Sequence, residues 1–269
     1  MDKLGKLKNA PVYFALVQVR HNPVPLLDGY AQSIKDEMRK AGYPDQEQSV
    51  ALSFSFVTSE QPEQQPTAKQ EQIQRLMFFN LSKTKGFIVE SSAITFYTTD
   101  YDVSETFFSD FLSGVLIVHN CVKLDYIERI GLRYLDAVVP PKGFSQLAEF
   151  LTPTVLGLTD MQGDIKVSHS MSETHFSTDD CNVLARTIII NDKGPIGFPM
   201  DIQLNGVTLD EKFASVNSEH AILDTDASID GRRLFDASLL SDELKKLKNG
   251  TRKAFGLLVT NEAIAFWNT

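Results

Sequence analysis

Two arginines near the middle of the chain are the strongest candidates for binding chemistry. Arg129 and Arg133 stand four residues apart in a segment rich in β-forming residues, so both side chains fall on one face of a predicted strand. A guanidinium group forms paired hydrogen bonds with carboxylates and phosphates, so the two arginines, with Tyr134 beside them, predict an anion-binding site. The alternative, which we favour, is that they pair with acids of the sheet such as Glu90 or Asp136.

A second group of side chains has the chemistry of metal ligands. His169, Glu173 and His175 alternate along a strand predicted over 164–175, and Asp180 follows shortly after it. Imidazole and carboxylate groups bind zinc, so His169, His175 and Asp180 are candidate ligands. The spacing matches no standard zinc motif, however, and the serines between these residues are typical of a hydrated strand face.

Asp224 and Asp226 form a third pair, on one face of a later strand, where they could bind Mg²⁺ or act in acid–base chemistry. We favour a simpler role, in which they face water or pair with Arg232 and Arg233. The sequence contains no G-x-S-x-G elbow, no P-loop and no G-x-G-x-x-G fingerprint. It therefore predicts no cofactor, and it favours a protein that is not an enzyme.

Hydrophobic periodicity predicts the elements that must position these residues. In the first part of the chain, strands are predicted over 12–20, 50–57, 72–81, 86–90, 93–98 and 125–139, and helices over 26–41, from Ser104 onwards and over 145–150. In the second part, strands are predicted over 164–175, 182–190, 200–204 and 219–229, and helices over 241–258, capped by Ser241, and after Thr260.

Each part of the chain is thus predicted to be an antiparallel sheet followed by a long amphipathic helix. We expect an α+β fold of two similar halves, 1–151 and 152–269, packed closely together, with the helices on one face of each sheet. The strand over 125–139 is expected to be a central strand around which the other elements are organised.

Composition limits the classes of function. The chain has a formal net charge of −9, which disfavours binding to nucleic-acid phosphates. Two cysteines without a C-x-x-C spacing predict neither a disulfide framework nor a zinc ribbon. No apolar run approaches the length of a membrane span, and the N-terminus does not have the pattern of a signal peptide. These features predict a cytoplasmic protein that does not bind membranes.

Five segments, weak singly, resemble as a set a bacterial family of similar length that is sporadically distributed and uncharacterised. They are Asn9 to Val12, Val19-Arg20-x-x-Pro23, Gly131-Leu132-Arg133-Tyr134, Ile222-Leu223-Asp224-x-Asp226, and the Leu244-x-x-Leu247 helix that ends in Phe255. The resemblance implies an α+β cytoplasmic protein and assigns no catalytic residue. Sporadic distribution implies a role in conflict systems such as phage defence or toxin neutralisation. This chain departs from the family at Asp136, where members commonly have Asn or a similar polar residue.

The leading prediction is therefore a non-enzymatic cytoplasmic protein that binds another protein, as a sensor, adaptor or neutralising subunit. One alternative is a metal- or small-anion-dependent enzyme that uses Arg129 and Arg133, or His169, His175 and Asp180. Another is a nucleic-acid-binding effector subunit, and assembly into a homo-oligomer is left open.

Overall fold

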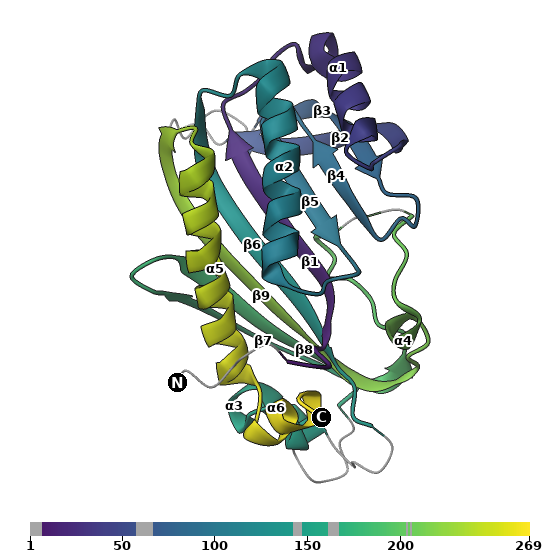
Figure 1. Cartoon of the computed structure of the whole chain (residues 1–269). Coiled ribbons are helices and arrows are strands. Elements are labelled where there is room, and N and C mark those ends of the chain that lie inside the picture. The colour runs from purple at the N-terminus through teal and green to yellow at the C-terminus, as the bar shows by residue number, and fades with distance from the viewer. Residues whose placement is uncertain (1–6, 58–66, 142–146, 161–166, 203, 205) are drawn as a thin grey trace.

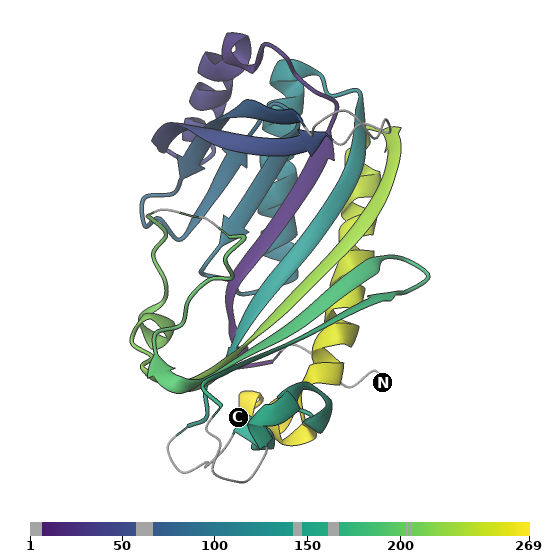
Figure 2. The ribbon, with the colours of Figure 1, turned by 180° about the vertical axis from the view of Figure 1, so that it is seen from behind.

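One antiparallel sheet of nine strands is the frame of the chain, with strand order β2-β3-β4-β5-β1-β6-β9-β8-β7 (Figures 1 and 2). The computed structural model describes residues 7–57, 67–141, 147–160, 167–202, 204 and 206–269. The strands are β1 Val12–His21, β2 Asp45–Val57, β3 Thr67–Phe79, β4 Lys85–Val89, β5 Ala93–Thr98, β6 Tyr126–Val138, β7 His169–Ser177, β8 Asn182–Gly194 and β9 Ser218–Leu234. The helices are α1 Leu27–Lys40, α2 Ser104–Val122, α3 Pro153–Leu156, α4 Glu211–Ala214, α5 Ala237–Leu258 and α6 Asn261–Trp267.

The predicted mixture of helices and antiparallel strands is confirmed, but two similar halves are not. Strands from both parts of the chain join in one continuous sheet, because β6 pairs with β1 on one side and with β9 on the other. β6 lies in the interior of this sheet, as predicted, and most of its residues are buried. Its central place explains why residues 130–138 are all buried, including the charged Arg133 and Asp136.

Several predicted elements are different in the structure. The strand predicted over 200–204 is wrong, since residues 200–202 and 204 lie in a turn and loop that follow Pro199. The helix predicted over 145–150 is reduced to the 3₁₀ turn Leu147–Glu149 among the described residues. Helix α5 begins before Ser241, because the Asp236 carboxylate accepts the backbone N–H groups of its first turn. Helix α6 follows Thr260, as predicted, and the Thr260 side chain caps it.

The long helices α1, α2 and α5 cover one face of the sheet (Figure 1). Glycines allow two of them to approach it closely. A Cβ atom on Gly114 of α2 would lie 2.2 Å from the ring of Phe87 on β4, and one on Gly250 of α5 would lie 2.5 Å from Cys181 Sγ. The main hydrophobic core fills this interface. No helix in the described part of the chain has the length and apolar character needed to cross a membrane.

The opposite face, which we call the open face, is covered only in part. The segment 195–217, which contains α4, runs over it on the β4 and β5 side of β1 (Figure 2), and its side chains pack against those of β1, β5 and β6. Ile196 and Phe213 of this segment are buried against Tyr13, Phe14 and other side chains of the sheet, and they form a second, smaller core. On the same face of β8 and β7, Ile188 packs against this smaller core, whereas Met171, Glu173 and His175 are exposed.

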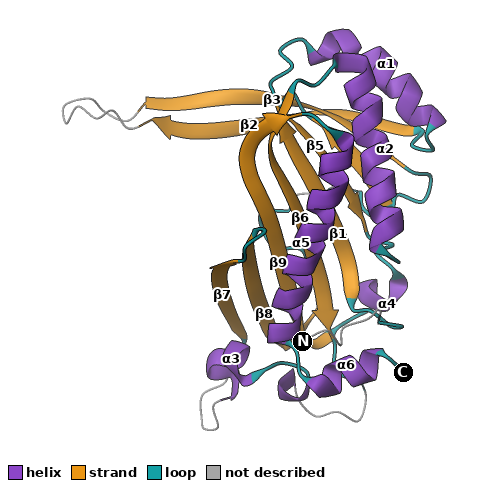
Figure 3. Cartoon of the chain, turned by 60° about the vertical axis from the view of Figure 1, so that its left-hand side comes forward, coloured by secondary structure: helices purple, strands orange, loops and turns teal. Residues whose placement is uncertain are grey.

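Strands β2 and β3 form an arm that projects from the sheet (Figure 3). They pair with each other over 13 residues, from Asp45 opposite Phe79 to Val57 opposite Thr67. Only Leu76–Phe79 of β3 continue the pairing to β4. Beyond that point the arm is a ribbon of two strands.

Candidate functional site

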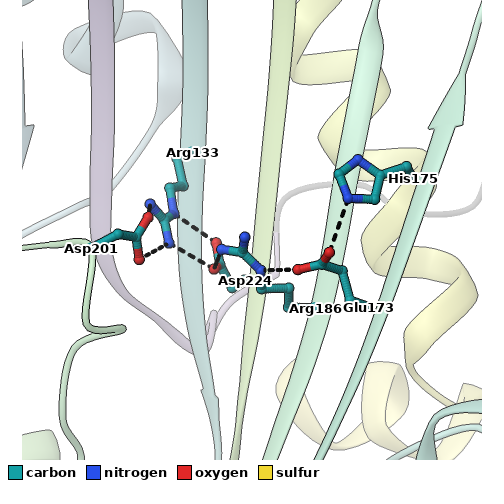
Figure 4. A network of polar contacts seen from close by, with 6 residues as sticks. All are labelled: Arg133, Glu173, His175, Arg186, Asp201 and Asp224. Carbon is teal, nitrogen blue, oxygen red and sulfur yellow. Dashed lines mark hydrogen bonds and ion pairs between the residues drawn. The ribbon is translucent and has the colours of Figure 1, made fainter. Parts of the chain in front are cut away.

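A row of charged side chains crosses the open face from β6 to β7 (Figure 4). Within this row, Arg133 on β6 donates hydrogen bonds to two carboxylate groups. The Nε and Nη2 groups of Arg133 donate to the two carboxylate oxygens of Asp224 on β9, both at 2.8 Å. Nη1 and Nη2 also donate to Asp201 of the segment 195–217, at 2.6 and 3.1 Å. Four N–H groups of one guanidinium therefore hold two carboxylates, which leaves no pair of donors for a further anion.

The row continues through Arg186 on β8. Its Nη1 lies 3.3 Å from Asp224 Oδ2, and its Nε donates to Glu173 Oε2 on β7 at 2.5 Å. The other oxygen of Glu173 lies 3.0 Å from Nε2 of His175. Asp224 is fully buried, so its two arginine partners compensate a charge that has no contact with water. Although burial opposes it, hydrogen bonding to Asp224 and Asp201 raises the pKa of Arg133.

Arg133 thus pairs with acids, as the favoured interpretation predicted, but these acids are Asp224 and Asp201 and not Glu90 or Asp136. Glu90 pairs with Arg75 at 2.6 Å, and Asp136 lies on the other face of β6. Arg129 makes a looser contact, with its Nε 3.6 Å from Asp230 Oδ1 in a half-exposed setting. The structure does not bring Arg129, Arg133 and Tyr134 together, because alternation along the strand turns Tyr134 towards the helices.

The three candidate metal ligands lie apart. His169 and His175 are both exposed on β7, and six residues of a strand separate them by roughly 20 Å. Asp180 lies beyond the end of β7, with Oδ1 3.8 Å from Lys246 Nζ. Across the part of the chain that the structure describes, no group of three His, Cys, Asp or Glu side chains is placed to hold a metal ion.

The helix-covered side of β6 contains a pocket of about 400 Å³. Four parts of the chain line it: the segment leading into β1, the beginning of α2 with the preceding loop, strand β6 with its neighbour Thr225 on β9, and one face of α5. Asp136 and Tyr134 of β6 contribute polar groups, and Phe255 of α5 with Val12 contributes apolar surface. We call this space the Asp136 pocket.

The Asp136 carboxyl group has no hydrogen-bond partner among the residues that the structure describes. Its residue is only 4% exposed, and no described residue donates a hydrogen bond to it. Burial therefore raises its pKa to about 8. Beside it, the hydroxyl oxygens of Tyr101 and Tyr134 lie 3.3 Å apart, and burial raises the pKa of both tyrosines. Asp136 is thus an uncompensated buried acid that opens into a pocket.

At another point of the pocket lining, a lysine of α5 bridges to α2. Lys248 Nζ donates to Ser104 Oγ and lies 3.5 Å from Glu105 Oε1. Helix α2 starts at Ser104, as predicted, with Val103 as its N-cap and no side-chain cap bond. The Ser104 hydroxyl instead contacts both Lys248 and Glu105.

Sequence reasoning missed the role of Asp136, because it treated this residue as a partner for arginine. The alternation of side chains was the available signal, since residues 134 and 136 must share a face that residues 129 and 133 do not. Lys248 carried no signal of its own, because it lies beside the apolar stripe of a helix. Its contact with the start of α2 is a property of the tertiary fold.

Comparison with known proteins adds no assignment. No model of a known protein family matches the chain, and a search of curated proteins gives no significant match. The resemblance to a sporadic bacterial family therefore rests only on the five segments quoted above.

Proposed function

We propose that the chain is a binding protein for a small organic molecule, which occupies the Asp136 pocket. The observation that carries this proposal is the Asp136 carboxyl group, which is buried, has no hydrogen-bond partner among the described residues and lines a space of about 400 Å³. Burying such a group without a partner costs free energy of folding. A ligand that supplies the missing partner would offset that cost.

The pocket has the general character of a ligand site. Its volume falls within the range of roughly 300–1,000 Å³ that is usual for small-molecule sites. Its lining combines apolar side chains such as Phe255 with a few polar groups that converge from separate elements. In contrast, the donors of Arg133 are already used by two carboxylates, which argues against the small-anion enzyme at that position.

A thermal-shift screen with a metabolite library tests the proposal. We expect at least one compound to raise the melting temperature, by roughly 5 °C or more at a concentration of about 100 times its Kd. Ala10→Trp, which places a large ring in the pocket lining, should abolish the shift. The control Ala265→Trp adds the same ring at an exposed position of α6 and should retain it. Compounds that stabilise Ala10→Trp as much as the unmodified chain would contradict the proposal.

Protein binding through the β2–β3 arm is a second candidate function. A hairpin of two strands is marginally stable in water when nothing packs against it. β2 is also the last strand of the sheet on its side, so one row of its backbone groups is open to pairing with another strand. We expect the partner to be a second copy of this chain, because two β2 edges can pair antiparallel about a two-fold axis.

Shortening the arm tests this second candidate. Residues 50–74 are replaced by Asn-Gly, which joins Ser49 to Arg75, two residues that face each other across the hairpin. Light scattering after size-exclusion chromatography should give a dimer for the full chain and a monomer for the shortened one. The pairing of β3 with β4 is untouched, so both should keep a cooperative thermal transition. A full chain that is monomeric at all accessible concentrations would rule out this candidate.

A further inference from the structure

The charged groups around the Asp136 pocket differ in how they are compensated. Lys248 is held by Ser104 and Glu105. Asp102 and Arg252 also line the pocket, and each makes an interaction of its own within the chain. Asp136 is different, because no described residue offers it a hydrogen bond or a cation. The charge that the site lacks is therefore positive, and it is lacking at Asp136.

The aromatic residues near Asp136 fit a cation. The rings of Tyr101 and Tyr134 have centroids 5.3 Å apart in an edge-to-face arrangement, and both residues line the pocket. Aromatic ring faces attract ammonium groups, and a buried carboxylate gains most from a partner that both carries charge and donates hydrogen bonds. We infer that the ligand of this pocket is a small organic amine whose ammonium group binds the Asp136 carboxylate; this inference rests on the proposed function.

Other classes of ligand fit less well. An anion would meet the carboxyl groups of Asp136, Asp102 and Glu105, while Lys248 is already engaged. A divalent metal ion would need several carboxylate, imidazole or thiolate ligands, and the described residues include no group of three that could supply them. An organic ammonium needs one carboxylate, with apolar walls for the rest of the molecule, and the pocket provides both.

Binding of an amine should be linked to release of a proton. Because burial raises the pKa of Asp136 to about 8, the carboxyl group is largely protonated at pH 6, and an ammonium group must displace that proton. The titratable and charged groups around it are Tyr13 of β1, Tyr134 of β6, Tyr101, Asp102 and Glu105 near the start of α2, and Lys248 and Arg252 of α5. Burial raises the pKa of the three tyrosines, so they keep their protons over this range. The affinity for amine should therefore rise with pH up to about 8.

Three probes of equal size separate the classes of ligand: 2-phenylethylamine, the neutral 2-phenylethanol and the anionic phenylacetate. Their dissociation constants are measured by ligand-observed NMR titration of the full chain. At pH 8.5 the amine should bind at least about tenfold more tightly than the alcohol, and it should bind at least about tenfold more weakly at pH 6. Asp136→Asn, which keeps the shape of the side chain, should abolish both the preference for amine and its pH dependence. Ala10→Trp should abolish binding.

The outcomes distinguish this inference from the proposed function. If the alcohol or the acid binds as tightly as the amine, and Ala10→Trp abolishes that binding, the pocket is a ligand site but the amine class is wrong. If Asp136→Asn retains the preference for amine, the inference is also wrong, because the ammonium group then has another partner. Failure of the amine to bind in the millimolar range overturns the inference, and the metabolite screen then decides the proposed function independently.

Discussion

Arg133→Ala is expected to lower the free energy of unfolding by about 3–5 kcal/mol, because it leaves the buried Asp224 carboxylate without its main partner. The substitution also removes the two hydrogen bonds that tie Asp201, and with it the segment 195–217, to the sheet. Urea unfolding followed by circular dichroism measures the loss. Hydrogen exchange should show, in addition, that the substitution accelerates exchange more in the segment 195–217 than in the helices.

Arg129→Ala is the matched control, since it removes an arginine from the same strand and face. Its partner Asp230 is 3.6 Å away and largely exposed, so the loss should be no more than about 1 kcal/mol. The double variant Arg133→Met/Asp224→Leu removes both buried charges and should recover much of the stability lost in Arg133→Ala. Equal losses in the two single arginine variants would show that burial of the ion pair does not determine its contribution.

Asp136→Asn is expected to have the opposite effect on stability, and one that grows with pH. In the folded chain the pKa of Asp136 is about 8, above its ordinary value of 3.8. Between these values the folded chain holds a proton that the unfolded chain has lost, so stability falls as pH rises and becomes constant above pH 8. The slope from this group is about 1.4 kcal/mol per pH unit. Asp136→Asn has no such proton, so it should become more stable than the unmodified chain as pH rises towards 8.

The measurement is the difference in unfolding free energy between the two chains at a series of pH values from 5 to 9. The difference cancels the contributions of other titrating groups, which both chains share. Curves that run parallel over this range would mean that Asp136 is compensated by a partner in the folded chain. A variant that gains stability while it loses amine binding would identify Asp136 as a residue kept for binding at a cost in stability.

The sequence predicted what depends on local periodicity. It placed most strands and the three long helices close to their observed positions, and the alternation in β6 correctly put Arg129 and Arg133 on one face. It also favoured pairing with acids over a free anion site, which agrees with the contacts of Arg133. These features follow from neighbouring residues and the repeat of a strand or helix.

What the sequence did not predict depends on residues far apart in the chain. Asp201 reaches Arg133 from a segment 68 residues later, a segment that was predicted as a strand and is a loop. The continuous sheet requires β6 to pair with β9, about 90 residues further on, and no local sequence pattern indicates that these two strands pair. The Asp136 pocket is built from four separate segments, so none of them carries a motif for it.

The two faces of β6 have a consequence for how this chain can evolve. Arg133 faces the open side and Asp136 the helix side, so the ion row and the pocket depend on a single strand register. An insertion or deletion of one residue early in β6 would shift its register by one residue and exchange the faces of the side chains that follow. Arg133 would then face the pocket, and Asp136 would face the side of Asp224. Substitutions within β6 can therefore tune the pocket gradually, whereas an insertion or deletion there would disrupt both features at once.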